Sequence, residues 1–450
     1  MKGLFPFSNS KVPSILFLAL VIIISFSSKN FSQDEAVIID TVLQDDAVYE
    51  TMQAGEFTPS KGFSLFKSSA ASLNISVYGL ARYINQLPGE QSFEDHLGRT
   101  RFIDTRQDIM WHRTFLWASG HFFTPKLRYC ISIWGLTTTN QTLVFGYLQY
   151  QLLKEMRIGV GIGPNVGTRS MMGTWPFFLS SDRVLAEEFF RPGFTSGVWI
   201  QGELLPTFYY HAMLGNNLSQ LGTTASNLTR DLSTSIGFWW MPTTNEFGQR
   251  GGNGDFEMHE EVATRFGVSF THARDDRQTS VGNPSPNNTQ VKLSDGVLFY
   301  ETGALAEGVT VKKADFDELA IDAGVKHNGW HAQTEYFVRN LSKFDAVGPE
   351  EELSTIPSSI FDHGFYFSLS YEAIPKLLQI YASTSWIFDD FKRNPWEIVG
   401  GFNVYPAGVR ALRLNVNVIY VDKSPASSSF GFYQGGLKGP ILSTGVDFLF

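Results

Sequence analysis

Several charged residues lie within one segment, 164–193, that separates two stretches of alternating polar and apolar residues, and five of them could line an aqueous path. They are Arg169, Arg183, Glu187, Glu188 and Arg191. Opposite charges facing each other across a narrow aqueous path set up a transverse electric field, which sorts small solutes by size and charge. The alternative interpretation of the same residues is an ordinary solvated loop. The choice between the two depends on the elements that flank the segment.

Other clusters that could support chemistry give weaker signals. The run GVGIGPNVG at 159–167 lacks the G-x-G-x-x-G spacing of a dinucleotide loop, and its glycines alternate with apolar residues as in a strand. MHEE at 258–261 is not the H-E-x-x-H motif of zinc hydrolases. Asp275 and Asp276 could bind calcium on a loop, as a minor alternative. We therefore expect no catalytic residues, no metal site and no cofactor.

The elements around these residues have the period of two that is typical of strands. Segments of about 9 to 14 residues recur, which is the length that a tilted strand needs to cross a bilayer. They centre on 72–85, 108–123, 126–136, 141–152, 155–164, 194–205, 206–216, 229–241, 261–273, 315–328, 330–340, 362–371, 377–388, 396–405, 411–422 and 442–450. This even number of alternating segments predicts an all-β fold, a transmembrane antiparallel β-barrel of about 16 strands.

Two local patterns support the barrel. The chain ends on LSTGVDFLF, in which apolar residues from Leu442 to Phe450 alternate with small or polar ones. A final strand that closes against the first must be regular to its last residue. Asn328-Gly329 favours a two-residue hairpin turn, which sets Val325 opposite Ala332 and places an apolar and a polar face along both strands.

The connections alternate in length, as they do in outer-membrane barrels. If Phe450 lies at the periplasmic rim, the periplasmic turns are short and the outer connections are mostly long. One connection, 242–260, is long although it falls on the periplasmic side, and the pattern offers no reason for it. On the same count, 164–193 follows the fifth strand on the outer side.

The N-terminal residues and the composition indicate where in the cell the protein is located. Residues 1–32 begin with Lys2 and Lys11, continue with an apolar run at 15–24 and end on small and polar residues, as a signal peptide does. We expect a periplasmic leader at 33–71 and the barrel at 72–450, in the bacterial outer membrane. The single cysteine, Cys130, cannot form an internal disulfide, and the net charge of −9 argues against a nucleic-acid partner.

At this point the chain resembles the phosphate-selective porin O and P family. The resemblance is specific in LQYQLLKEMRIGVGIGP at 148–164 and EEFFRPGFTSGVWIQGEL at 187–204, where Phe190, Pro192 and Gly193 match the family pattern. The sequence departs from that pattern at 163–166, which reads Gly-Pro-Asn-Val instead of a basic residue followed by proline and phenylalanine.

The resemblance implies a trimeric barrel of sixteen strands in which the long loop after strand 5, here 164–193, folds inward as the constriction. It also implies a homotrimer in contact with outer-membrane lipids. The barrel-assembly machinery would recognise the C-terminal strand that ends in Phe450. The solutes implied are small and hydrophilic, with anions such as phosphate as one option.

Alternation predicts which strand residues face the lumen. They include Arg128, Arg157, Glu203, Arg265, Lys326, Arg339 and Arg413. Basic residues slightly outnumber acidic ones on the predicted inner face, which indicates a weak anion preference. The simpler interpretation is that these charges are the polar half of the alternating pattern.

We therefore predict an outer-membrane porin for passive diffusion, which is not an enzyme. Two alternatives remain at this stage. The first is a non-conducting barrel that acts as a surface adhesin or binding protein. The second is an outer-membrane enzyme of the lipase type, against which the histidines lie on separate predicted strands.

Overall fold

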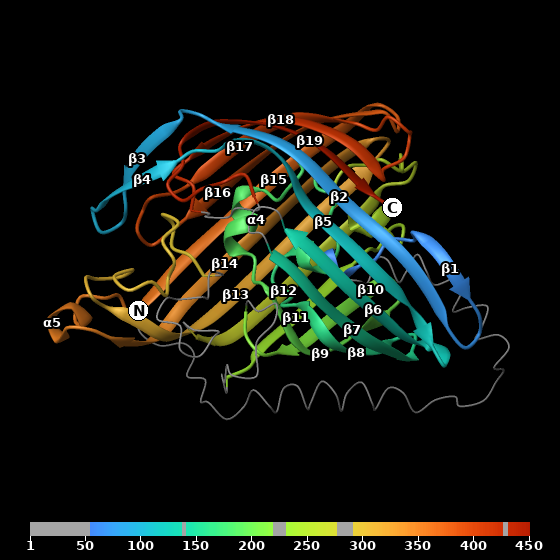
Figure 1. Ribbon diagram of the computed structural model, residues 1–450, viewed down its shortest axis with the longest axis horizontal. Coiled ribbons are helices and arrows are strands. Elements are labelled where there is room, and N and C mark those ends of the chain that lie inside the picture. Colours follow the sequence, from blue (N-terminus) through green and yellow to red (C-terminus); the bar gives the residue numbers. More distant parts are fainter. Residues whose placement is uncertain (1–54, 137–140, 219–230, 277–290, 426–430) are drawn as a thin grey trace. The chain divides into compact units, whose positions relative to one another are not determined.

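The structure, a computed structural model, describes residues 55–136, 141–218, 231–276, 291–425 and 431–450 (Figure 1). Antiparallel strands and their connections account for most of these residues. The expected signal peptide at 1–32 lies outside the described residues, as does the expected leader as far as residue 54.

Sixteen strands form the wall of a closed antiparallel barrel, which confirms the predicted fold class. They are β2 (Ser72–Gln86), β5 (Gln107–Phe122), β6 (Thr124–Leu136), β7 (Gln141–Leu153), β8 (Met156–Pro164), β9 (Phe194–Leu205), β10 (Phe208–Gly215), β11 (Ser233–Trp240), β12 (Ala263–Asp276), β13 (Thr310–His327), β14 (Trp330–Val347), β15 (Ser359–Ile374), β16 (Leu378–Phe388), β17 (Trp396–Val404), β18 (Leu412–Asp422) and β19 (Gly439–Leu449). Each overlaps one predicted segment.

The last residue of the chain takes part in closing the wall. β19 pairs with β2, and the Phe450 N–H donates to the Val77 carbonyl over 2.8 Å while the Val77 N–H donates to the Phe450 carbonyl over 2.9 Å. Beyond this point β1 (Phe63–Lys67) pairs with the start of β2, and the rings of Phe63 and Phe450 lie 4.2 Å apart. The wall is therefore hydrogen-bonded as far as Phe450.

The hairpin β13–β14 has the register that the Asn328-Gly329 turn predicts. Val325 lies opposite Ala332 and Asp322 lies opposite Glu335. The two turn residues have φ angles of 47° and 82°, the left-handed values that Asn and Gly tolerate best. The turn therefore sets which side chains enter the lumen along both strands.

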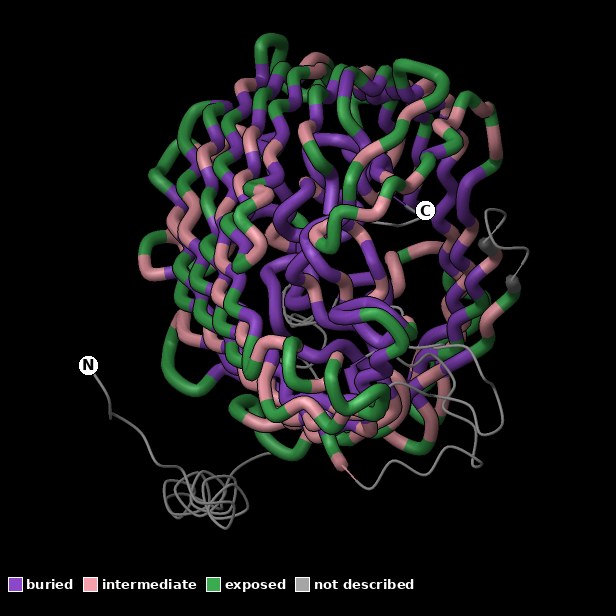
Figure 2. The backbone as a smooth tube through the Cα atoms, turned by 90° about the vertical axis from the view of Figure 1, so that its left-hand side faces the viewer, coloured by how far each residue is buried: buried purple, intermediate pink, exposed green. Residues whose placement is uncertain are grey.

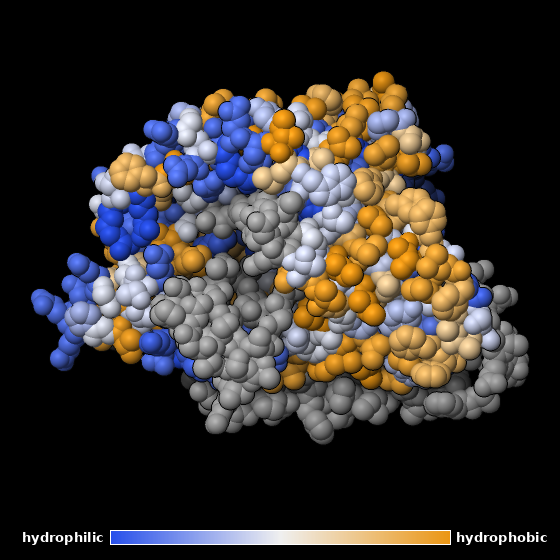
Figure 3. Space-filling model, in the orientation of Figure 1, coloured by the Kyte–Doolittle hydropathy of each residue, from blue (hydrophilic) through white to orange (hydrophobic). Residues whose placement is uncertain are grey.

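The two faces of the wall differ in polarity. In β12, the outward residues Phe266, Val268 and Phe270 are exposed, whereas the inward residues Arg265 and Ser269 are buried. Apolar side chains cover much of the wall in Figure 3, and hydrophilic ones gather toward the end that carries β3, β4 and α5. A closed barrel with a paired backbone and an apolar exterior is the architecture of bacterial outer-membrane proteins, and we assign the chain to that membrane.

Outer elements extend further than alternation predicts. β13, β14 and β15 continue past their predicted ends, since residues beyond the lipid need not alternate. β3 (Glu90–Glu94) and β4 (Thr100–Asp104) form a hairpin within the outer connection 86–107. Asp95, in the turn between these strands, accepts hydrogen bonds from Arg99 over 2.8 Å and from Arg101 over 2.9 Å.

The helical elements are short. They are η1 (Gly55–Phe57), η2 (Arg169–Met172), α4 (Leu185–Phe190), η3 (Gln249–Gly251) and α5 (Glu350–Leu353). Among the described residues, no helix has both the length and the apolarity to cross a membrane. Figure 2 shows buried segments running inside the ring of strands. η1, η2, α4 and η3 belong to those segments, because these elements or residues next to them are hydrogen-bonded to inward-facing residues of the wall.

Candidate functional site

The connection after the fifth wall strand lies inside the barrel. We call residues 165–193 the outer lumen segment; almost all of it is buried. The Asn403 side chain donates to the Leu179 carbonyl over 2.9 Å, and the Leu185 N–H donates to the Glu397 carboxylate over 2.7 Å. Both partners lie on β17, so inward-facing wall residues hold the segment by its backbone.

Arg169 links this segment to a second part of the wall. Its backbone N–H donates to Glu335 over 2.8 Å, and its guanidinium lies 3.7 Å from the Asp322 carboxylate and donates to Gln333. It also donates to the Asn253 side chain over 2.8 Å. Two of these partners are carboxylates buried on β13 and β14, so Arg169 supplies buried positive charge next to both acids.

Arg183 and Asp182 form a second charged centre. The Arg183 guanidinium donates to Glu56 over 2.7 Å and to the Ser170 hydroxyl over 2.9 Å. The Asp182 carboxylate accepts a hydrogen bond from Arg113 and lies 3.7 Å from Arg82, both on the wall. These groups are buried, and both Asp182 and Arg183 have more than one partner of opposite charge.

The other predicted charges of the segment lie near its helix α4. Glu187 is 3.9 Å from the Arg183 guanidinium, and Glu188 is 3.6 Å from Arg191. Arg191 also lies over the ring of Phe194, 5.9 Å from its centroid. All five charged residues singled out from the sequence therefore occur inside the barrel, where their charges face one another and the wall.

A second segment enters the lumen from the rim at which β19 ends, which is the periplasmic end in the topology that the sequence predicts. It comprises residues 241–262, which we call the periplasmic lumen segment, and includes the connection of unexplained length. The Lys326 ammonium donates to the carbonyls of Phe247 and Gly252 over 2.7 and 2.8 Å. The connection is therefore long because it folds back into the barrel instead of turning directly into the next strand.

His259 connects two parts of the periplasmic lumen segment through its side chain. Its ring nitrogens are hydrogen-bonded to Asp255 and, over 2.6 Å, to Glu246. Burial alone would lower the pKa of His259, but these two carboxylates outweigh it and raise the pKa to about 9. The imidazole is therefore charged at neutral pH and cross-links two parts of the segment.

One group of side chains in this segment has the composition of a metal site. Asp255, Glu257 and His259 place potential ligand atoms within 4.8 Å of one another. However, both nitrogens of His259 are hydrogen-bonded, and Glu257 lies 3.4 Å from Arg410. Burial raises the pKa of Glu257, but Arg410 and Lys326 lower it to about 2. A charged imidazole has no lone pair for a metal, so hydrogen bonding explains the group.

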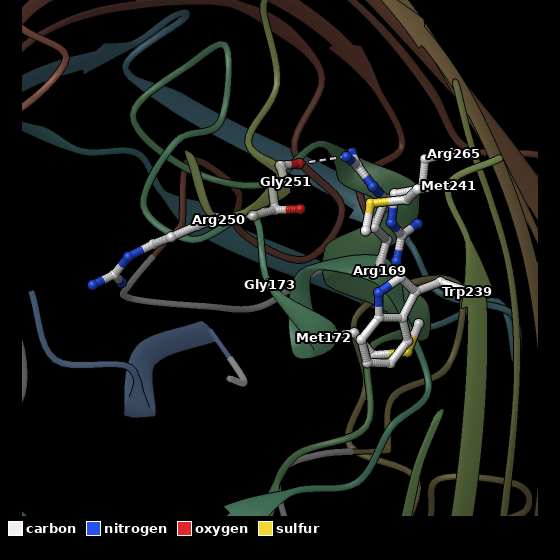
Figure 4. A pocket seen from close by; sticks show the side chains of 9 residues that line it. Arg169, Met172, Gly173, Trp239, Met241, Arg250, Gly251 and Arg265 are labelled. Carbon is white, nitrogen blue, oxygen red and sulfur yellow. Dashed lines mark hydrogen bonds between the residues drawn. The ribbon is translucent and has the colours of Figure 1, made fainter. Parts of the chain in front are cut away.

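The two lumen segments meet beside the wall (Figure 4). The Thr174 N–H donates to the Arg250 carbonyl over 2.6 Å, and the Asn253 N–H donates to the Phe177 carbonyl over 2.8 Å. A small cavity lies at this junction, lined by residues of both lumen segments and of the wall; Figure 4 shows the hydrogen bond from Arg169 to Gly251 at its edge.

The predicted lumen residues divide into two groups. Arg265, Lys326, Arg339 and Arg413 lie near the lumen segments, and three of them pair with wall acids: Arg265 with Asp322, Arg339 with Asp362 over 2.6 Å, and Arg413 with Asp447 over 2.6 Å. Arg128, Arg157 and Glu203 lie near the periplasmic ends of their strands, where Lys154 is 2.7 Å from Glu203 and Arg157 donates to Gln151 over 2.9 Å.

A third segment in the lumen comes from the expected leader. Residues 55–58 are buried, and the Trp117 indole donates to the Glu56 carbonyl over 3.2 Å. The Arg250 guanidinium donates to the Thr58 carbonyl over 2.8 Å. The alternation of polar and apolar residues could not predict this placement, because residues 55–58 are not part of a strand and show no two-residue repeat. The only available sign was Glu56-Phe57, a charged and an aromatic residue next to each other.

The sequence was also compared with known proteins. No protein-family model matches it, and no match was found among curated protein sequences. Similar solved structures include the outer-membrane expressed OmpT of Vibrio cholerae, with 11% identity, a TM-score of 0.48 and coverage of 86% of this chain and 99% of that one. Another is an anion-selective porin from Comamonas acidovorans, with 11% identity, a TM-score of 0.45 and coverage of 84% and 100%. The high-pH structure of Pseudomonas putida OprB has 9% identity, a TM-score of 0.49 and coverage of 84% and 94%.

Proposed function

We propose that the protein is a porin-type channel through which small hydrophilic solutes diffuse passively across the outer membrane. The observation that carries this proposal is the charged outer lumen segment, 165–193, held inside a sixteen-stranded barrel by wall residues. A barrel of this size is wide enough for an aqueous lumen, and the segment narrows it. Arg169, Arg183, Glu187, Glu188 and Arg191 would then form the constriction.

The charges suggest only a weak ion preference. Arg265, Arg339 and Arg413 are paired with carboxylates, so each contributes little net field to the path. We propose that small anions, phosphate among them, pass slightly more readily than cations because basic residues outnumber acidic ones among the predicted lumen positions. We also propose a homotrimer without catalytic activity, assembled through recognition of the strand that ends in Phe450.

Single-channel recording of the refolded protein in planar bilayers tests the proposal. We expect discrete steps in multiples of three, with a reversal potential in a salt gradient that indicates a small anion preference. Neutralising Glu187 and Glu188 to Gln should increase that preference, while Glu90→Gln on the outer hairpin should not change it. A folded, heat-modifiable barrel without current would contradict the channel.

The filling of the lumen favours a second candidate, a closed barrel that binds partners at its surface. The outer and periplasmic lumen segments are hydrogen-bonded to each other, through Thr174 to Arg250 and Asn253 to Phe177. If these bonds persist in the membrane, solutes have no continuous path. The same recordings separate the candidates, because a closed barrel gives no steps at any salt concentration.

A further inference from the structure

Two adjacent residues of the chain occupy a site between the wall and the outer lumen segment. The ring of Phe57 lies among three aromatic rings, with centroids 5.5 Å away for Trp134, 5.1 Å for Phe145 and 4.7 Å for Phe194. These rings come from three different wall strands, β6, β7 and β9. The wall therefore encloses one phenyl ring from several sides, an arrangement that stabilises an aromatic guest.

The residue next to Phe57 supplies a carboxylate to the same site. Glu56 is 4% exposed, and its carboxylate accepts a hydrogen bond from Arg183 over 2.7 Å. A carboxylate this deeply buried requires a cation beside it. The site thus holds an aromatic ring and a negative charge, supplied by two neighbouring residues.

The site also offers a donor that these residues do not use. The Trp134 indole nitrogen is buried, and within the described part of the chain it has no hydrogen-bond partner. A buried indole N–H usually finds an acceptor. An oxygen-bearing ligand beside Trp134 would supply one, which the Phe57 ring cannot.

We propose that this is a solute-binding subsite for small aromatic carboxylates, and that Glu56 and Phe57 occupy it as a tethered mimic of such a solute. Arg183 would bind the ligand's carboxylate, while Trp134, Phe145 and Phe194 would enclose its ring. This inference rests on the proposed channel, because a solute must reach the lumen to bind. It deepens that proposal by naming the solute class and the residue that selects it.

The tether explains how a weak mimic can compete with a free solute. The Ser60 N–H donates to the Ser76 hydroxyl of β2 over 3.1 Å, so the wall anchors the segment close to the site. A group held on a short tether has an effective concentration in the millimolar range. Free ligand must therefore displace Glu56 and Phe57, and removing those side chains should reveal the site.

Calorimetric titration of the detergent-solubilised protein with 3-phenylpropionate tests the inference. Glu56→Gln combined with Phe57→Ala should bind this acid about tenfold more tightly than the unchanged protein, because the mimic is gone. Adding Arg183→Gln should reverse the gain by about tenfold, and 3-phenylpropionamide, which has no charge, should bind poorly. Phe102→Ala, at a ring that is 84% exposed on the outer hairpin, is the matched control and should change nothing.

Equal affinity in the unchanged protein and the double variant would overturn the inference, as would equal binding of the acid and the amide. If the double variant fails to reach the heat-modifiable form, Phe57→Leu keeps the apolar volume and should still raise affinity. Planar-bilayer recordings separate the two proposals. Current without binding refutes the subsite and leaves the channel, whereas binding without current refutes the channel and supports the site.

Discussion

The outer and the periplasmic lumen segments fill the same barrel but are held in different ways. The outer segment sends long charged side chains to buried wall acids, as Arg169 does to Asp322. The periplasmic segment instead offers backbone carbonyls to Lys326 and is cross-linked internally by His259. Substituting a charged residue should mainly affect the outer segment, whereas a change of pH through the pKa of His259 should mainly affect the periplasmic segment. The contributions of the two segments can therefore be measured separately.

The largest effect should come from removing one segment at a time. Replacing 168–190 with a short glycine-serine linker should raise single-channel conductance by about threefold or more, because the narrowest part of the path is lost. The same replacement of 244–258 should raise it less if the outer segment forms the constriction. A larger increase from the periplasmic deletion would reverse the comparison and move the constriction to that segment.

A single arginine should be nearly as important to the outer segment. Arg169→Met removes the buried cation beside Glu335 and one of the two guanidinium groups that face Asp322, which keeps its pair with Arg265. This change should lower the free energy of unfolding by about 3 kcal/mol. Urea unfolding followed by heat-modifiable gel mobility measures the change. The control is Arg99→Met, whose side chain is 40% exposed beside Asp95 and whose loss should cost less than about 1 kcal/mol. Similar losses for both variants would show that the Arg169 pairs are solvated.

The periplasmic segment should instead respond to pH. The pKa of His259 is raised to about 9 from its ordinary 6.5, so the charged ring stabilises the segment fully below pH 6.5, and this contribution disappears as the pH rises through about 9. After allowance for screening of a half-buried group, the loss should be on the order of 2 kcal/mol. Limited proteolysis within 241–262 should therefore accelerate between pH 7 and 10. His259→Gln should remove this pH dependence; its persistence would assign it to another group.

The smallest effect concerns the turn on which the periplasmic segment rests. The Gly329 N–H donates to Asp255 over 2.8 Å, and the Asn328 N–H donates to the His259 carbonyl over 2.8 Å. Gly329 has a φ of 82°, so Gly329→Ala should lower the free energy of unfolding by about 1 kcal/mol. Gly400→Ala, where an added methyl group meets no atom within 4 Å, should be neutral in the same urea titration. Equal results would mean that the turn relaxes freely.

The wall could be predicted strand by strand because its signal is local. Each strand repeats every two residues, and one slip would move every apolar side chain from lipid to lumen. The Asn328-Gly329 hairpin therefore has the predicted pairs, including Val325 with Ala332. The β3–β4 hairpin lacked that signal, because outside the lipid its side chains are not sorted by face. Its stability comes from Asp95 and the two arginines that contact it.

Strand counting predicted that the charged segment 164–193 lies in the lumen, but it did not predict which residues its charges would contact. Nothing in the local sequence connects Arg183 with Glu56, which lies 127 residues away along the chain. The same holds for the connection 242–260. Its unexpected length was visible in the sequence, but the sequence did not indicate that the connection folds into the lumen. Charged residues in a water-filled barrel have many possible partners of similar energy, so only the folded chain selects among them.

The sequence by itself determined the barrel wall: an even number of alternating strands, the register of the hairpin at Asn328-Gly329 and the closing strand that ends in Phe450. Only the tertiary structure decided what lies inside it, namely three segments that enter the lumen and the pairs that hold them. The physical reason is the range of the interactions. The alternation of apolar and polar residues in a strand is a local pattern, visible in neighbouring residues. The buried pairs of Arg169 and Arg183 instead join residues that are far apart in the sequence and that closure of the barrel brings together.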